Sequence, residues 1–314
     1  MPAINGYLVA HAWFTRRRNK RNVIHYDMPL YRPPSEGNNL IIQATLGCHF
    51  NQCSFCSMYK QKQFEARPLN IVFDEITQAA RAWPEAQRVF LADGDALTLP
   101  TEHLIKIAER LAAAFPKLTR IACYANPSDI LRKTAAELAR LREHKLNLLY
   151  VGIESGSSTI LKKITKGASP RSIRAALEKA HQAELKVSAT VILGLGGKTR
   201  SKEHINGTIE LLNSAPITYL STLQLFLQPN EEIEFLRKFA EPFEMQDDTA
   251  ILQEQRKLVG GINPPKPVIF RSNHASNALA LAGNLPKDRE RLIAQIDQAL
   301  GNDNHLRPRY LRRL

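Results

Sequence analysis

The sequence has few cysteines and no long apolar run. Only four cysteines occur in 314 residues, and three of them, Cys48, Cys53 and Cys56, lie within nine residues of one another. No stretch approaches the roughly 20 apolar residues that a membrane helix needs, and the N-terminal basic run follows the apolar residues, the reverse of a secretory signal. We therefore expect a cytoplasmic protein without membrane association, whose clustered thiols serve metal binding or catalysis rather than disulfides.

Acidic residues are in the minority. The 43 Lys and Arg residues outnumber the 30 Asp and Glu residues and give a net charge of +13. Part of this charge lies in two runs, residues 16–21 and 307–313. Such runs can bind nucleic acid or other polyanions. A solvated tail is the plainer interpretation, because aromatic residues that stack on bases are sparse here.

From residue 40 onward, short apolar or β-branched runs alternate with longer helical patterns, and hydrophobic residues make up 44% of the chain. This alternation predicts βαβ units around a parallel sheet, in a partial barrel or a doubly wound arrangement. In both, ligands gather at the carboxyl ends of the strands. Thr101 is the expected N-cap of one helix. The expected strands span residues 40–46, 88–92, 118–124, 146–152, 186–193 and 218–226, and the expected helices span residues 73–83, 102–115, 133–144, 170–184 and 202–212.

The two ends of the chain lack this alternation. Residues 1–38 are predicted to form a leader, residues 39–230 the α/β core, and residues 231–314 a C-terminal extension. The extension contains two polar helical segments, a Gly/Pro break, a short apolar run at residues 268–270 and a final helix at 287–300.

The cysteine triplet follows the first expected strand, so it lies where a ligand site is expected. Zinc would need a fourth ligand. His49 could supply it, but adjacent residues such as Cys48 and His49 rarely reach one ion, and Cys123 is expected to be a core residue. Thiol redox chemistry is another alternative. Three thiolates without a partner pair suit a [4Fe–4S] cluster that keeps one iron free.

Together with later motifs, this loop resembles that of the radical S-adenosylmethionine (SAM) enzymes. The resemblance implies a partial (β/α)6 barrel, in which Cys48, Cys53 and Cys56 hold a [4Fe–4S] cluster and SAM binds the open iron. Phe55 takes the place of the aromatic residue that lies near the adenine in this family. The first interval is one residue longer than in the usual C-x3-C-x2-C pattern, because this chain has C-x4-C-x2-C. The family also implies a reductant such as flavodoxin or ferredoxin.

The stretch after the second expected strand resembles the family's segment that binds the amino group of SAM. This assigns a SAM contact to Asp93, Gly94, Asp95 and Ala96. An ordinary Asp-Gly turn is the alternative.

Two further strand ends match the family pattern. After the fourth strand, Glu154 and Ser155 match the polar residues for the ribose or methionine part, and Lys166 matches the basic residue for the SAM carboxylate. A helix start capped by a serine is the alternative there. After the fifth strand, Val191 to Gly194 are expected near the adenine, and a tight turn is the alternative.

Polar and basic residues crowd residues 270–277, "FRSNHASN". We expect the segment from about residue 262 to cover the barrel mouth. Arg271 is expected to hold a carboxylate or phosphate of the substrate, and His274 is expected to move a proton. The predicted function is reductive cleavage of SAM to a 5′-deoxyadenosyl radical that abstracts hydrogen from an unidentified substrate. A radical SAM enzyme acting on RNA, and a basic zinc module that binds nucleic acid without catalysis, stay open as alternatives.

Overall fold

The structure, a computed structural model, describes residues 24–302 and 306–312, so the basic run at residues 16–21 lies outside the described residues. An eight-stranded sheet has the order β1-β4-β5-β6-β7-β8-β9-β10. Strands β1 to β9 of this sheet are parallel, and β10 is antiparallel to β9. The strands are β1 Leu40–Gln43, β4 Arg88–Ala92, β5 Arg120–Tyr124, β6 Leu146–Glu154, β7 Lys186–Leu193, β8 Tyr219–Gln224, β9 Val268–Ser272 and β10 Leu281–Leu285.

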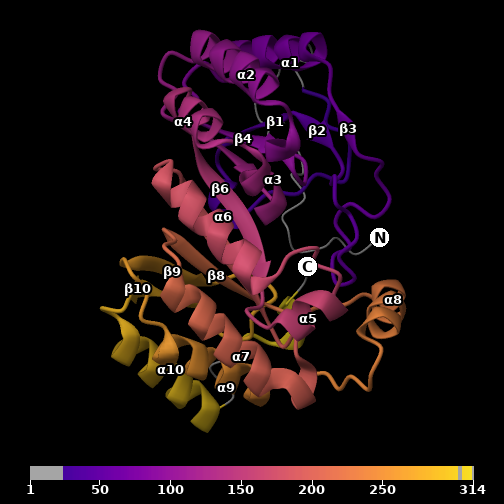
Figure 1. Cartoon of the computed structure of the whole chain (residues 1–314), viewed down its shortest axis with the longest axis vertical. Coiled ribbons are helices and arrows are strands. Elements are labelled where there is room, and N and C mark those ends of the chain that lie inside the picture. Colours follow the sequence, from indigo (N-terminus) through magenta and orange to yellow (C-terminus); the bar gives the residue numbers. More distant parts are fainter. Residues whose placement is uncertain (1–23, 303–305, 313–314) are drawn as a thin grey trace.

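Helices follow the sheet from α1 and α2 at the top of Figure 1 to α9 and α10 at the bottom. The main helices between strands are α1 Leu69–Ala82, α2 Thr101–Ala114, α4 Ala135–Glu143, α6 Pro170–Gln182, α7 Gly197–Ser214, α8 Pro229–Phe239 and α9 Asp248–Gly261, with α10 Arg289–Gly301 after β10. Alternate strand residues face opposite sides. Val89 and Leu91 therefore pack in the main core with the helices, whereas Phe90 and Ala92 pack in a smaller inner cluster with Leu30 of the leader.

The predicted α/β fold with a parallel sheet is confirmed. The strands expected at residues 88–92 and 186–193 have those bounds in the structure, whereas the strand expected at 40–46 is interrupted at Ala44. Its second part, β2 Thr45–Leu46, pairs with β3 Glu65–Ala66 in a separate small sheet. The apolar run expected at 268–270 is a seventh parallel strand, so the extension enlarges the sheet. Strand β10 and the short helix α3 Pro127–Arg132 were not predicted, and α5 Ser158–Lys163 was predicted only as a possible helix start.

The expected N-cap role of Thr101 is wrong. Pro100 occupies the N-cap of α2, and the Thr101 hydroxyl donates instead to Glu137 at 2.8 Å. The serine cap considered after the fourth strand is present, because the Ser157 hydroxyl accepts a hydrogen bond from the Ile160 amide at the start of α5.

The leader crosses the inner face of the sheet. The Tyr26 hydroxyl donates to the Ile41 carbonyl, and Gln43 bonds the backbone of Asp27. Further along, the buried Glu36 accepts hydrogen bonds from Arg120 and Tyr150. These contacts fasten the described part of the leader over three strands.

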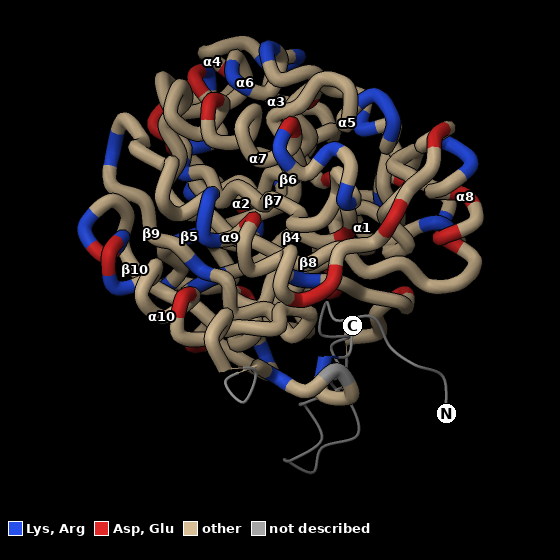
Figure 2. Tube along the Cα trace, turned by 90° about the horizontal axis from the view of Figure 1, so that it is seen from below, with Lys and Arg blue, Asp and Glu red and all other residues tan. Residues whose placement is uncertain are grey.

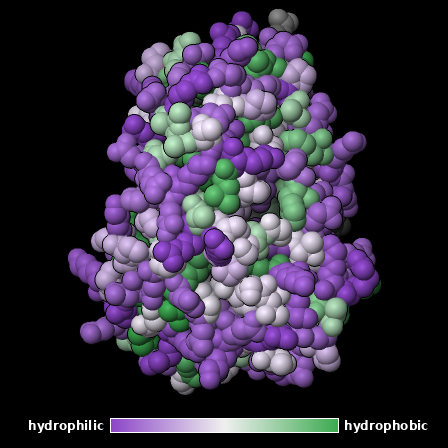
Figure 3. Space-filling model, viewed as in Figure 1, coloured by the Kyte–Doolittle hydropathy of each residue, from purple (hydrophilic) through white to green (hydrophobic). Residues whose placement is uncertain are grey.

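The surface is mixed in character. Figure 2 shows Lys and Arg interspersed with Asp and Glu around the molecule, and Figure 3 shows hydrophobic residues in small groups between hydrophilic ones on the face in view. None of the described helices is both long and apolar enough to span a membrane.

Candidate active site

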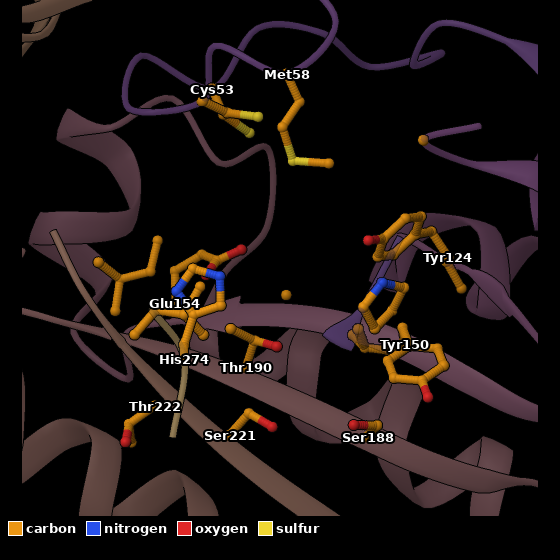
Figure 4. Close-up of a pocket in the computed structure, with 18 of the residues that line it drawn as sticks. Cys53, Met58, Tyr124, Tyr150, Glu154, Ser188, Thr190, Ser221, Thr222 and His274 are labelled. Carbon is orange, nitrogen blue, oxygen red and sulfur yellow. The ribbon is translucent and has the colours of Figure 1, made fainter. Parts of the chain in front are cut away.

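A cavity of about 410 Å³ opens at the carboxyl ends of the strands. Its wall combines the cysteine loop, the ends of β4 to β9 and part of the leader (Figure 4). Nine of the residues singled out from the sequence line it. They are Cys48, Cys53, Phe55, Cys56, Gly94, Glu154, Lys166, Arg271 and His274.

The cysteine loop is fastened to the end of β4. The Asp93 carboxylate accepts hydrogen bonds from the Gly47 amide at 3.2 Å and from Lys62 Nζ at 3.0 Å. The Gly94 amide donates to the Gly47 carbonyl at 3.0 Å. A Cβ at Gly94 would lie 2.6 Å from the Tyr59 ring and 2.9 Å from Cys48 Cβ. Only glycine therefore lets the strand end and the loop pack this closely.

Of the four residues assigned to the amino group of SAM, only Gly94 lines the cavity. Asp93 is fully buried against Lys62, and Asp95 is fully buried and accepts a hydrogen bond from Asn126 at 2.6 Å. Ala96 is buried in the main core. The two carboxylates thus bind the cysteine loop and the neighbouring strand end instead of facing a ligand. Of this stretch, Gly94 is the residue that borders the cavity.

Glu154 and Lys166 form a buried ion pair in the wall, with Nζ and Oε1 2.9 Å apart. Glu154 has a positive φ of 57°, an uncommon conformation for a residue with a side chain. Its carboxylate folds back over Gly152, where a Cβ would lie 2.0 Å from Glu154 Oε1. Burial alone would lower the pKa of Lys166, but the nearby Glu154 carboxylate outweighs this effect. The net shift of the Lys166 pKa is upward, so the lysine stays charged. The wall thus offers one positive and one negative side chain that can each form a charged hydrogen bond to a ligand.

Three other residues expected at the site do not line the cavity. Ser155 bonds the buried His204 at 2.8 Å, Val191 lies in the main core, and the Gly194 amide donates to Glu254 at 2.7 Å. Because strand residues alternate in direction, the β7 residues that line the cavity are those of the other parity. These are Ser188, Thr190 and Ile192.

Arg271 and His274 reach the cavity from β9 and the loop after it. His274 is buried, and its Nδ1 accepts a hydrogen bond from the Ser276 amide at 3.2 Å. An amide can only donate, so the neutral imidazole carries its proton on Nε2.

Several cavity residues were not found from the sequence. Tyr124 and Tyr150 lie near or at strand ends that were predicted, so the strand-end rule could have indicated them. Pro33, Pro34 and Ser35 come from the leader and carry no local signal. Ser35 reaches Tyr150, 115 residues away, with 2.8 Å between the hydroxyl oxygens.

The three thiols lie in surroundings that disfavour their charged form. Burial raises the pKa of all three thiols, that of Cys56 to about 12. A bound cation is what would favour the thiolate in such surroundings.

The number and placement of the thiols fit an iron–sulfur cluster. Cys48, Cys53 and Cys56 line one cavity, whereas Cys123, the fourth cysteine, lies apart in the main core. A closed zinc site takes four ligands, and three thiolates suit a [4Fe–4S] cluster that keeps one iron free.

Two curated proteins are similar to part of this chain. The chain is 26% identical over 188 residues to the heme chaperone HemW of Bacillus subtilis, a match that covers 58% of this chain and 48% of that protein. It is also 26% identical over 182 residues to an uncharacterized methyltransferase of Pyrococcus horikoshii, covering 57% of this chain and 38% of that one. The matches thus span less than half the length of these curated relatives.

Among solved structures, the crystal structure of methylornithine synthase (PylB) aligns with a TM-score of 0.47 and 16% identity, covering 85% of this chain and 81% of that one. The family model described as "Radical SAM superfamily" matches residues 42–212, more than half of the chain. The chain therefore belongs to the radical SAM superfamily, whose enzymes use a [4Fe–4S] cluster and SAM.

Proposed function

We propose that this protein cleaves SAM reductively and directs the resulting radical at a substrate held in the same cavity. The observation that carries this proposal is the convergence of the cysteine triplet, Gly94 and the Glu154–Lys166 pair on one cavity. When bound, the cluster and SAM supply a 5′-deoxyadenosyl radical that abstracts hydrogen from substrate.

The residues of the wall have distinct parts in this proposal. Cys48, Cys53 and Cys56 hold the cluster. Lys166 donates to the carboxylate of the methionine part, and Glu154 accepts from its amino group or from the ribose. The two side chains can exchange their mutual ion pair for these ligand contacts without leaving a buried charge unpaired.

The wall also limits contact with water. Pro33, Pro34 and Ser35 of the leader cover one side of the cavity, and the loop after β9 covers another. A reactive radical needs such shielding from solvent and from stray hydrogen donors. The leader therefore shares the covering role that the sequence analysis assigned to the C-terminal extension alone.

A cytoplasmic location and a protein reductant such as flavodoxin or ferredoxin belong to the same proposal. Action on RNA has less support from the described residues. In the C-terminal basic run, Arg307 bonds backbone carbonyls of this chain and Arg312 pairs with Asp248 at 2.6 Å. These two side chains are occupied within the fold.

Anaerobic reconstitution tests the proposal. The protein should take up about four irons per chain, as this cluster type requires, and should release 5′-deoxyadenosine with dithionite and SAM. Cys53→Ala should abolish both. Cys123→Ala is the matched control, because Cys123 is buried in the main core and should leave the iron content unchanged. A colourless protein with one zinc per chain, or a cluster that never cleaves SAM, contradicts the proposal.

A further inference from the structure

We propose that the substrate is a small molecule with a carboxylate or phosphate group, and that Arg271 binds this group at the β9 end of the cavity. This inference rests on the proposed function and adds the class of substrate. It is carried by the charges of the wall, by the way this end is fastened, and by the size of the cavity.

One of the charged side chains that line the cavity has no partner of opposite charge among the described residues. The acidic and basic side chains that line the cavity are Glu154, Lys166 and Arg271. The first two neutralise each other. Within residues 24–302 and 306–312, no carboxylate lies within ion-pair distance of Arg271, whose Nη1 donates to the Phe270 carbonyl at 2.8 Å. The cavity therefore carries one positive charge without a counter-charge, and a planar guanidinium matches a carboxylate or phosphate in a two-point geometry.

Neutral donors lie on the neighbouring strands. Arg271 of β9 is in register with Ser221 of β8, and Ser221 also lines the cavity. Thr190 and Ser188 of β7 line it as well, and Figure 4 shows all three hydroxyl side chains along the same part of the wall. Hydroxyl groups beside a guanidinium supply the further hydrogen bonds that an anion accepts.

Hydrogen bonds hold the loop after β9 in place beside Arg271. Asn277 fastens the loop after β9 to β8, because its side chain accepts from the Gln224 amide at 2.8 Å and donates to the Thr222 carbonyl at 2.7 Å. From the other side, Arg307 donates to the carbonyls of His274 and Ala275 at 2.9 and 2.8 Å. The C-terminal segment thus acts as a strap on this loop.

The strap also adds charge. Arg307 has no carboxylate within ion-pair distance among the described residues, and its Nη1 is bonded to the backbone of the loop. Its hydrogen bonds serve the fold, but its charge adds to that of Arg271 and favours an anionic ligand over a neutral one.

Size and shape favour a small molecule over a nucleic-acid strand. The whole cavity has a volume of about 410 Å³, within the roughly 300–1,000 Å³ range of small-ligand pockets. In the proposed function SAM takes up part of this volume, so the space left for a substrate is that of a small molecule. Tyr124, Tyr150, Pro33 and Pro34 form a more apolar part of the wall. The Tyr150 hydroxyl already donates to Glu36 at 2.5 Å. A ligand would therefore contact Tyr150 through its apolar ring. The substrate we infer has an anionic group and an apolar portion.

Protection of Arg271 from chemical modification tests this inference. The reconstituted protein with SAM is treated with phenylglyoxal, an arginine reagent, at constant ionic strength, with rising inorganic phosphate or acetate. Modification is followed by peptide mass spectrometry. Arg88 is the internal control, because it is also exposed and lacks an ion-pair partner among the described residues but begins β4, away from the carboxyl ends.

Phosphate or acetate should slow modification of Arg271 at least about fivefold and leave Arg88 unaffected, and the better protector identifies the anionic group. Ser221→Ala should raise the half-protecting concentration about two- to tenfold, as loss of one hydrogen bond implies. Equal behaviour of Arg271 and Arg88 overturns the inference. Stronger protection by a single-stranded RNA oligonucleotide than by either small anion overturns it in favour of a nucleic-acid substrate.

Iron content and 5′-deoxyadenosine release are measured on the same preparation. Loss of anion protection with intact SAM cleavage refutes the substrate class alone. Absence of a cluster refutes the proposed function, whatever the anions do.

Discussion

The two ends of the cavity treat charge differently. At the cysteine end, Asp93 pairs with Lys62 and Glu154 pairs with Lys166. At the β9 end, Arg271 faces the cavity without such a partner among the described residues. The two ion pairs are neutral before any ligand arrives, whereas Arg271 gains a partner when an anion binds. This contrast separates a cofactor end from a substrate end.

The largest effect that we expect comes from Asp93→Asn, which breaks the fastening of the cysteine end. Breaking a buried ion pair costs about 3–5 kcal/mol, and we expect the low end of this range because Lys62 keeps Asp27 at 2.7 Å. The free energy of unfolding and the iron retained after desalting should both fall. Asp74→Asn on the exposed side of α1 is the control. Equal iron retention in the two variants would show that Asp93 does not hold the loop.

Glu154→Gln tests the paired charges in the wall. A hydrogen bond to a charged group contributes about 1.5–3 kcal/mol, so the affinity for SAM should fall at least about tenfold while the iron content stays the same. Calorimetric titration with SAM under anaerobic conditions measures this. Ser155→Ala should leave the SAM affinity unchanged, because Ser155 bonds His204 instead of lining the cavity. A loss of affinity in the serine variant would restore the role expected from the sequence.

Arg307→Ala should loosen the β9 end alone. Two hydrogen bonds to the carbonyls of His274 and Ala275 are lost, so the amides of residues 273–277 should exchange hydrogen about tenfold faster, as about 1.4 kcal/mol implies. Iron content and SAM affinity should not change, and Arg307→Lys should restore part of the protection. Arg237→Ala on the exposed side of α8 is the control. Unchanged exchange in residues 273–277 would show that Arg307 does not hold this loop.

The smallest effect concerns pH and the buried His204, which supports the wall through Ser155 and the Ile192 carbonyl. Burial lowers the pKa of His204. The unfolded chain therefore binds a proton more readily than the folded chain below about pH 6.5, the ordinary histidine value. The free energy of unfolding should fall as the pH drops below that value, by at most about 1.4 kcal/mol per pH unit. Denaturant unfolding between pH 5 and 8 should show a shallower slope for His204→Gln, and equal slopes would assign the effect to other groups.

The sequence predicted the parts of the site that local pattern controls. Strand periodicity and the position of the cysteines after β1 placed the triplet at the carboxyl ends of the strands. The face of a strand on which a given side chain lies was harder to predict from the sequence. Val191 and Ile192 differ by one position but face opposite sides of β7, and only Ile192 lines the cavity. A pattern that identifies a strand does not fix which face meets a ligand.

Contacts between segments far apart in the sequence could not be predicted from local sequence patterns. Asp93 was assigned to a ligand, yet its partner Lys62 lies in a loop whose path no periodicity predicts. Ser35 meets Tyr150 across 115 residues. Arg307 likewise bonds the carbonyls of His274 and Ala275, which precede it by 33 and 32 positions. Neither of these contacts lies in a helix or strand. Such pairings depend on how the whole chain closes on itself.

The way β9 joins the sheet has a consequence for how the two ends of the cavity can be changed independently. Three residue pairs connect β9 to β8, from Tyr219 and Ile269 to Ser221 and Arg271. The family match ends at residue 212, before both strands. Arg271 and Ser221 therefore lie outside the matched range, whereas the cysteine triplet lies inside it. Substitutions in β8 and β9 can alter one end of the pocket without changing any residue that the family model matches.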